Sequence, residues 1–266
     1  MRPTSTSSPS ANKVLTHALS LLGFVGFWWL LSIAKADPLI LPSPLVVMDT
    51  LVEEASSGKL WRHVGMTLYR MSAAFAIAMI VGTILGLVFG RLTPLDQWAQ
   101  PWVTIFLNIP ALVVIVLCYL WIGLNEIAVI AAVAVNKTAM VTVTLREGAR
   151  VLSPSLDDMA RVYRLTLAER LRHVWMPQLA PFLLSAARSG IAMIWKVVLV
   201  AEFLGRSSGI GFQIHLNFQL FNIAGVLAYA IAFIAVMLVI EFVLFEPLDQ
   251  RINRWRHGEP SERRAM

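Results

Sequence analysis

The segment that organises this chain reads SLDDMARVYRLTLAERLRHVWMPQLAP over residues 155–181, a charged stretch between long hydrophobic runs. Ser155 precedes Asp158 by three residues, and Thr166 precedes Glu169 by the same spacing. This spacing lets a hydroxyl and an acid satisfy the free N–H groups at the start of a helix. The segment is therefore predicted to form two short helices.

Each of the two predicted helices has an apolar face. Helical spacing places on these faces Leu156, Met159, Ala160 and Tyr163 in the first helix, and Leu167, Leu171, Val174 and Trp175 in the second. The charged side chains off the two faces are Arg161, Arg164, Glu169 and Arg170. A helical pair with one apolar and one charged face, held in water by its flanking segments, is typical of a surface that docks on another protein.

The composition indicates an integral membrane protein. Apolar residues make up 58% of the chain and charged residues 14%, and the mean hydropathy is +0.70. Soluble domains have roughly 25% charged residues, so a large soluble domain is excluded. The single cysteine, Cys118, excludes an intrachain disulfide and a multi-cysteine metal site. The net charge of +6 is better explained by orientation in the membrane than by binding to nucleic acid.

We expect an all-α polytopic membrane protein with about six transmembrane helices, because a bilayer is spanned by about 20 apolar residues. The predicted spans are residues 17–34, 65–90, 98–122, 126–145, 182–204 and 223–245 within a membrane domain of residues 17–246. Residues 1–16 are expected to be a disordered tail, residues 46–63 an interfacial amphipathic helix, and residues 247–266 a second tail. Cleavage of the first span as a signal peptide after Ala36 remains an alternative.

Several residues in the predicted spans have structural consequences. Gly82, Gly86 and Gly90 recur every four residues, a spacing that would allow a neighbouring helix to approach closely. The alternative is that each glycine is merely tolerated in a membrane helix. Asn108 and Pro110 fall near the middle of the third span, where the proline frees a backbone carbonyl that neighbours must satisfy.

The distribution of Lys and Arg predicts the orientation of the chain. Fourteen lie on the side of both termini, in the tails, the turn at Arg91 and the segment from Arg146 to Arg172, whereas four lie on the opposite side. Cytoplasmic loops are enriched in Lys and Arg, so both termini and the charged segment are predicted to be cytoplasmic.

Together these residues resemble the inner-membrane permease subunits of binding-protein-dependent ABC importers. The cytoplasmic loop of those subunits carries a Glu-Ala-Ala motif, a glycine four residues after the second alanine, and then Ile-x-Leu-Pro. The matching positions here are Asp158-Met159-Ala160, Arg164 and Val174-Trp175-Met176-Pro177. Arg164 departs from the family's glycine, at the turn between the two predicted helices.

Most of the chain resembles the nitrate, sulfonate and taurine branch of that family. The matching residues are Gly58-Lys59-Leu60-Trp61 with His63, Leu68 and Arg70; Asn108-Ile109-Pro110-Ala111; Trp121-Ile122-Gly123 with Glu126; Ala201-Glu202; and Gly209-Ile210-Gly211. The fourth span departs from the branch, because it has Asn136-Lys137 in place of an aromatic-rich stretch with proline. The substrate is therefore not inherited from the branch name.

The resemblance implies that residues 155–177 form a coupling loop seated in a cleft of a cytoplasmic ATP-binding subunit. Its implied coupling residues are Leu156, Asp158, Met159, Ala160, Arg161, Tyr163, Arg164, Leu167, Glu169, Leu171 and Pro177. Ala160 would permit close backbone approach of the ATPase. This chain would bind no cofactor, since it lacks a phosphate-binding glycine loop and ATP-Mg would bind to the partner.

The resemblance further implies an extracytoplasmic solute-binding protein, a second permease copy and an inner-membrane location in the lipid bilayer. Homodimerisation is expected, and a heterodimer with a related chain stays open.

Polar residues inside spans are candidates for the translocation path of a small organic or inorganic anion, because their burial in a bilayer is costly. Lys137 is the first candidate, followed by Asn108, Asn136, Lys196 and Glu202, with Glu202 expected to pair with Lys196 or Arg206. Structural ion pairing and snorkelling are competing interpretations.

Two other functions compete with the importer. A stand-alone secondary transporter or channel would also use Lys137, although no internal repeat is detectable. A membrane enzyme would need convergent acid–base or metal-binding groups, and the five histidines show no metal-ligand spacing.

Overall fold

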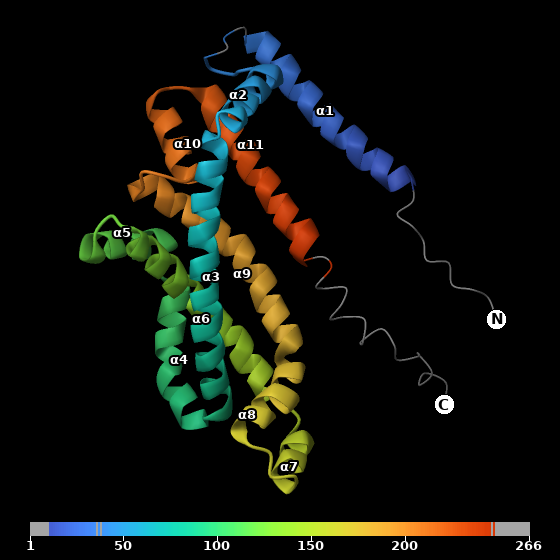
Figure 1. The fold of residues 1–266 in the computed structure, drawn as a ribbon, viewed down its shortest axis with the longest axis vertical. Coiled ribbons are helices and arrows are strands. Elements are labelled where there is room, and N and C mark those ends of the chain that lie inside the picture. Colours follow the sequence, from blue (N-terminus) through green and yellow to red (C-terminus); the bar gives the residue numbers. More distant parts are fainter. Residues whose placement is uncertain (1–10, 36, 38, 246, 248–266) are drawn as a thin grey trace, which may run out of the picture. The chain divides into compact units, whose positions relative to one another are not determined.

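The computed structural model describes residues 11–35, 37, 39–245 and 247. This part of the chain is mainly helical and has no strands, which confirms the predicted all-α class (Figure 1). Its elements are α1 (Ala11–Lys35), α2 (Pro44–Ser56), α3 (Lys59–Arg91), α4 (Thr93–Asn108), α5 (Ala111–Ile122), α6 (Glu126–Arg150), α7 (Pro154–Val162), α8 (Leu167–Arg170), η1 (Leu171–Trp175), α9 (Met176–Gly205), α10 (Ile210–Gln219), α11 (Ile223–Ile240) and η2 (Glu241–Phe245).

Membrane-crossing length is reached by four helical stretches of the described chain: Lys59–Arg91, Glu126–Arg150, Leu167–Gly205 and Ile223–Val243. They correspond to the predicted second, fourth, fifth and sixth spans. The predicted first span is the shorter apolar helix Leu19–Lys35 within α1. Of the expected tails, residues 1–10 and 248–266 lie outside the described residues, as does Ala36 of the alternative cleavage site.

The predicted third span, residues 98–122, is divided between α4 and α5 at Pro110. Helices α4 and α5 meet at an angle of 95°. Pro110 has no N–H, and its ring disfavours helical backbone at the preceding residue. Ile109 accordingly has an extended ψ of 124°, so the helix ends at Asn108 and a new one begins at Ala111.

Two other predicted boundaries are also corrected. The interfacial helix expected over residues 46–63 is broken, because Gly58 has a φ of +79° between α2 and α3. Helix α1 begins at Ala11 rather than after residue 16. A helix satisfies its own backbone hydrogen bonds, so it can extend past the apolar residues that cross the bilayer.

The described residues fall into two compact units. One lies within Met1–Trp61 and Gln213–Ala232, and the other within Arg62–Phe212 and Phe233–Met266. In the first unit, the Tyr229 hydroxyl donates a hydrogen bond to Glu54 Oε2 at 2.7 Å. The Trp28 indole donates to the Pro42 carbonyl at 3.2 Å, which ties α1 to the segment before α2.

The second unit is built on a contact between α3 and α6 that the glycine spacing predicts. A Cβ atom added at Gly82 or Gly86 would lie 2.6 Å from the Cβ atoms of Val141 and Leu145, respectively. At Gly90 it would lie 2.5 Å from the Cβ of Ala149. Side chains cannot approach this closely, so the three glycines are required for the two backbones to pack, as predicted.

Two apolar clusters complete this unit. In one, Trp195 of α9 stacks on Phe233 of α11 with ring centroids 4.4 Å apart, among buried residues of α3, α5 and α6. The other gathers Leu145, Leu152 and Leu179 near the ends of α6 and α9. The charged segment 155–177 begins three residues after Leu152 of this second cluster.

Candidate functional site

The charged segment folds into a short helix, α7, and the start of a second helix, which is long where a short one was predicted. The second begins with the predicted capping box: Thr166 Oγ1 accepts a hydrogen bond from the Glu169 N–H at 3.3 Å, and the Thr166 N–H donates to Glu169 Oε2 at 2.8 Å. From Leu167 the helix runs through α8, η1 and α9 to Gly205. The second helix of the segment is thus continuous with a membrane span.

The predicted capping box at Ser155 and Asp158 is wrong. Helix α7 begins two residues earlier than predicted, at Pro154, with Ser153 instead of Ser155 as its N-cap residue. Proline suits the first position of a helix because its φ is preset and it has no N–H to satisfy. The Ser155 hydroxyl lies 2.8 Å from the Ser153 hydroxyl instead of capping the helix.

Arg164 occupies the turn between α7 and α8 with a φ of +54°. The Leu165 N–H donates to the Ala160 carbonyl at 2.9 Å, and the Arg164 N–H donates to Arg161 at 3.0 Å. These two bonds form a Schellman motif, in which the residue at the position of Arg164 is usually glycine. The turn is therefore kept in this chain with an arginine in a strained backbone conformation.

Asp157 is the buried acid of α7, whereas the predicted Asp158 is exposed. Trp175 Nε1 donates to Asp157 Oδ1 at 2.7 Å, Arg170 donates to the same oxygen at 3.4 Å, and Arg91 at the end of α3 donates to Oδ2. Burial alone would raise the pKa of this carboxyl, but the bonds from Trp175 and Arg91 outweigh it and hold the pKa below its usual value.

The Arg91 guanidinium also lies 4.6 Å from the centre of the Trp175 ring. Asp157 shares a helical face with the buried Ala160, three residues on, and this spacing was the signal available in the sequence.

Most of the predicted coupling residues lie on the outer surface of the segment. Tyr163 is 73% exposed and Leu167 is 69% exposed, and Leu156 and Met159 are also exposed. Asp158 and Arg161 form an exposed pair at 3.7 Å. Arg164, Glu169 and Pro177 are exposed too, and Leu171 is half-buried.

Ala160 differs from the expectation, because it is 0% exposed and packs within its own chain. It is therefore not available to a partner as this structure stands, and a larger residue there would disrupt the segment itself.

A second polar cluster lies within the membrane domain and centres on Arg70 of α3. The Arg70 guanidinium donates to Glu202 Oε1 of α9 at 2.6 Å and to both carboxylate oxygens of Glu126 of α6 at 2.6 and 2.9 Å. It also donates to the Ser208 carbonyl at 2.7 Å. The side chains of Arg70 and Glu202 are both fully buried.

The loop after α9 closes over this cluster. The Gly211 N–H donates to Glu202 Oε2 at 3.0 Å, and Thr67 donates to the same oxygen at 2.9 Å. The Gly209 N–H donates to His63 Nδ1 at 3.0 Å, and Arg206 donates to Glu126. A Cβ at Gly209 or Gly211 would overlap Glu202, which explains both glycines. The cluster thus unites many of the residues that match the nitrate, sulfonate and taurine branch.

This cluster corrects the prediction for Glu202, which pairs with Arg70 and not with Lys196 or Arg206. Arg70 was missed as a site residue. The signal in the sequence was an arginine within a span together with acids at the ends of two others.

The other predicted path residues do not gather at one site. Lys137 is 2% exposed, with its Nζ 2.6 Å from Sδ of Met140, and Asn136 beside it is half-buried. Lys196 is exposed on α9. Asn108 is exposed at the end of α4, where it donates to the Thr104 carbonyl at 2.7 Å.

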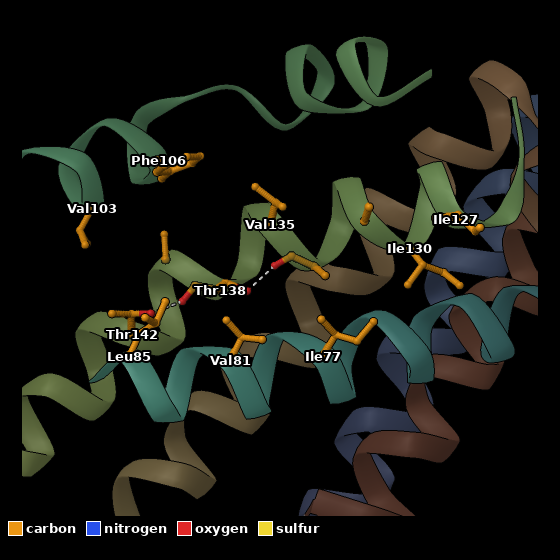
Figure 2. A pocket seen from close by; sticks show the side chains of 13 residues that line it. Ile77, Val81, Leu85, Val103, Phe106, Ile127, Ile130, Val135, Thr138 and Thr142 are labelled. Carbon is orange, nitrogen blue, oxygen red and sulfur yellow. Dashed lines mark hydrogen bonds between the residues drawn. The ribbon is translucent and has the colours of Figure 1, made fainter. Parts of the chain in front are cut away.

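A cavity of about 600 Å³ is lined by residues of α3, α4 and α6 (Figure 2). Its lining is apolar apart from Thr138 and Thr142. Both hydroxyls donate to backbone carbonyls of α6, at 2.7 and 2.8 Å. None of the five predicted path residues lines this cavity.

The Arg164 turn generates a first prediction. Arg164→Gly should stabilise the end of α7 by about 1 kcal/mol, because glycine adopts positive φ without steric cost. Arg161→Gly, inside α7, should instead destabilise the helix by about 1 kcal/mol. Hydrogen exchange of the Leu165 amide in the two variants measures both effects. Faster exchange in Arg164→Gly would contradict the strain.

The Arg70 cluster generates a second prediction. Removing one partner leaves a buried charge unpaired, so Arg70→Met should lower the free energy of unfolding by about 3–5 kcal/mol, and Glu202→Gln should also be destabilising. The double variant should cost clearly less than the sum of the two, as thermal unfolding in detergent can measure. Arg62→Met, which removes an exposed charge near the start of α3, is the control and should leave stability unchanged. Additive losses would show that the two residues do not interact.

The sequence is similar to a known protein family and to individual members of it. Residues 67–254 match the family described as binding-protein-dependent transport system inner membrane component. The putative aliphatic sulfonates transport permease protein SsuC of Escherichia coli strain K12 is 30% identical over 88% of this chain and 89% of its own length. The taurine transport system permease protein TauC of the same strain is 25% identical over 94% of this chain and 93% of its own.

The fold is also found in a solved structure. A chain of the MetNI methionine ABC transporter, described as inward facing, superposes with a TM-score of 0.57 at 18% identity, covering 73% of this chain and 93% of that one. The family match extends over most of the chain and includes the segment 155–177. This chain therefore belongs to the family of binding-protein-dependent inner-membrane components, the permeases of ABC importers, and within that family it is similar to the sulfonate and taurine permeases.

Proposed function

We propose that this permease forms part of the translocation path of an ATP-driven importer and is coupled to a separate cytoplasmic ATPase through residues 155–177. The observation that carries the proposal is the exposed apolar surface of α7 and α8. Tyr163 and Leu167 expose most of their side chains to water at a position that matches the family's coupling motif. Exposed apolar groups rimmed by charges are typical of a protein interface.

The charged residues around this surface can fix the position in which a partner protein binds. Asp158 and Arg161 are exposed on α7, and Arg164 is exposed in the turn that follows it. Rim charges of this kind act mainly on the specificity and rate of association. ATP and Mg²⁺ would bind to the ATPase, since this sequence has no phosphate-binding glycine loop. Closure of two ATPase subunits would then displace the loops and rock the spans between inward-open and outward-open states.

The remaining parts of the proposed importer follow from the same family. An extracytoplasmic solute-binding protein delivers the solute, and a second copy of this chain completes the path. Lys196 and Asn108 support the second copy, because both are exposed in the single chain although both lie in apolar segments. Both termini lie in the cytoplasm, on the side richer in Lys and Arg.

We propose a small organic or inorganic anion, such as a sulfonate, as the substrate, and Lys137 as the residue of this chain that attracts it. The relatives named for sulfonates and taurine support an anion, and so does a buried lysine within α6. Within the part of the chain that the structure describes, no carboxylate forms a salt bridge with Lys137. Its charge is thus available to an anion when the path opens.

The coupling surface is tested by placing a charge on it. Tyr163→Asp and Leu167→Asp should abolish co-purification of the ATPase chain from mildly solubilised membranes, while insertion and thermal stability stay normal. Leu92→Asp is the matched control, because Leu92 is an exposed apolar residue at the start of α4, where aspartate is favoured as an N-cap. Retained association in both loop variants would disprove coupling through this surface.

The role of Lys137 is tested by Lys137→Met, which keeps the length of the side chain but removes its charge. Uptake into proteoliposomes should need about tenfold more substrate for half-maximal rate, as expected for the loss of one charge-assisted bond. Association with the ATPase should be unchanged. Normal uptake by the variant would remove Lys137 from the path.

A further inference from the structure

Asp157 of α7 joins two helices that are distant in the chain, α3 and the continuous helix that begins at Leu167. It lies in the first turn of α7, and its partners are the last residue of α3, Arg91, the last residue of α8, Arg170, and the last residue of η1, Trp175. Arg91 and Arg170 also flank the Trp175 ring, with guanidinium carbons 4.6 and 5.5 Å from its centre. We call Asp157, Arg91, Arg170 and Trp175 the α7 clamp.

The clamp leads directly into the membrane helices. Trp175 is continuous with α9, and Arg91 is continuous with the glycine face of α3. Gly90, next to Arg91, lies so close to Ala149 of α6 that a side chain has no room between them. A displacement of Arg91 along α3 therefore has to be shared by α6, because closely packed backbones transmit strain.

Among the described residues, Arg91 makes the hydrogen bond that ties α7 to α3. The bonds from Arg170 and Trp175 to Asp157, and a bond from the Ser153 N–H to Gln178 of α9 at 2.9 Å, tie this end of α7 to the helix that begins at Leu167 instead. Asp158, by contrast, makes its described ion pair with Arg161 within α7, at 3.7 Å. Adjacent acids thus face in opposite directions: Asp158 faces outward, and Asp157 faces the spans.

We propose that the α7 clamp transmits motion of the coupling loop to α3 and α6, with Arg91 and Asp157 as its positioning residues. The inference rests on the proposed docking of α7 and α8 on an ATPase. Motion of the loop reaches α9 through the continuous helix that begins at Leu167, and it reaches α3 and α6 through the Arg91–Asp157 pair. If that pair is broken, the ATPase still binds and still hydrolyses ATP. Helix α9 then moves with the loop, but α3 and α6 do not.

The test compares Asp157→Asn and Arg91→Gln with wild type in proteoliposomes that contain the assembled transporter. We expect normal association with the ATPase and retained ATP hydrolysis. Solute moved per ATP should fall about tenfold, the change expected when one charge-assisted hydrogen bond no longer favours the coupled arrangement. The ratio of uptake to hydrolysis is the decisive readout, since a merely destabilised transporter loses both activities together.

Asp96→Asn is the matched control. Asp96 is also a buried acid on this side of the domain, held by Arg146 and Arg150 of α6 at 3.2 and 2.6 Å, but it makes none of the described contacts with α7. Its loss should leave the ratio of uptake to hydrolysis unchanged. Asp158→Asn should weaken association and thus lower uptake and hydrolysis together.

A covalent replacement of the clamp provides a rescue. In a Cys118→Ser background, which removes the single native cysteine, the variant Arg91→Cys with Asp157→Cys should have a low ratio of uptake to hydrolysis. A short bifunctional thiol reagent that joins the two cysteines should restore the ratio.

A normal ratio in Asp157→Asn and Arg91→Gln, with normal association, would overturn this inference alone. Loss of association in both variants, together with lost hydrogen-exchange protection of α7, would also overturn it, because the pair would then serve only to fold the loop. A wild-type chain that brings down no ATPase would overturn the proposed function, and this inference with it.

Discussion

Arg70 and Glu202 face each other with fully buried side chains, 2.6 Å apart, and the membrane domain is arranged to keep them paired. Water does not solvate a charge that is buried inside a bilayer, so each charged group needs hydrogen-bonding partners within the protein. Glu126, Thr67 and the backbone around Ser208 supply them. The cluster holds α3, α6 and α9 in one relative position, because any shift between these helices would leave a buried charge without its partner.

Helix α3 forms a second interhelical ion pair at its last residue, Arg91. Arg91 binds Asp157 of α7 as Arg70 binds Glu202 of α9, and the glycines between the two arginines pack on α6. The two ion pairs differ in burial: Arg70 is fully buried, while Arg91 is partly exposed. The buried pair is suited to hold the helices together, and the more exposed pair is suited to move with a loop.

The features that could be predicted from the sequence depend on residues close together in the chain. The Thr166–Glu169 capping box and the glycine spacing of α3 depend on residues three or four apart, and both were confirmed. The partner of Glu202 could not be predicted, because Arg70 lies 132 residues away and only the fold brings them together. Asp157 was missed because α7 begins at Pro154, one residue before the predicted cap at Ser155, and the choice between two adjacent acids depends on how α7 packs.

The charged segment 155–177 combines a buried inner side with an exposed outer side. Asp157 and Ala160 are buried against the rest of the chain, while Tyr163 lies on the surface. Contact between this outer side and an ATPase can be measured by placing a photo-reactive amino acid at Tyr163 in native membranes. We expect a cross-linked adduct with the ATPase chain. Adducts with lipid or with this chain alone would contradict this expectation.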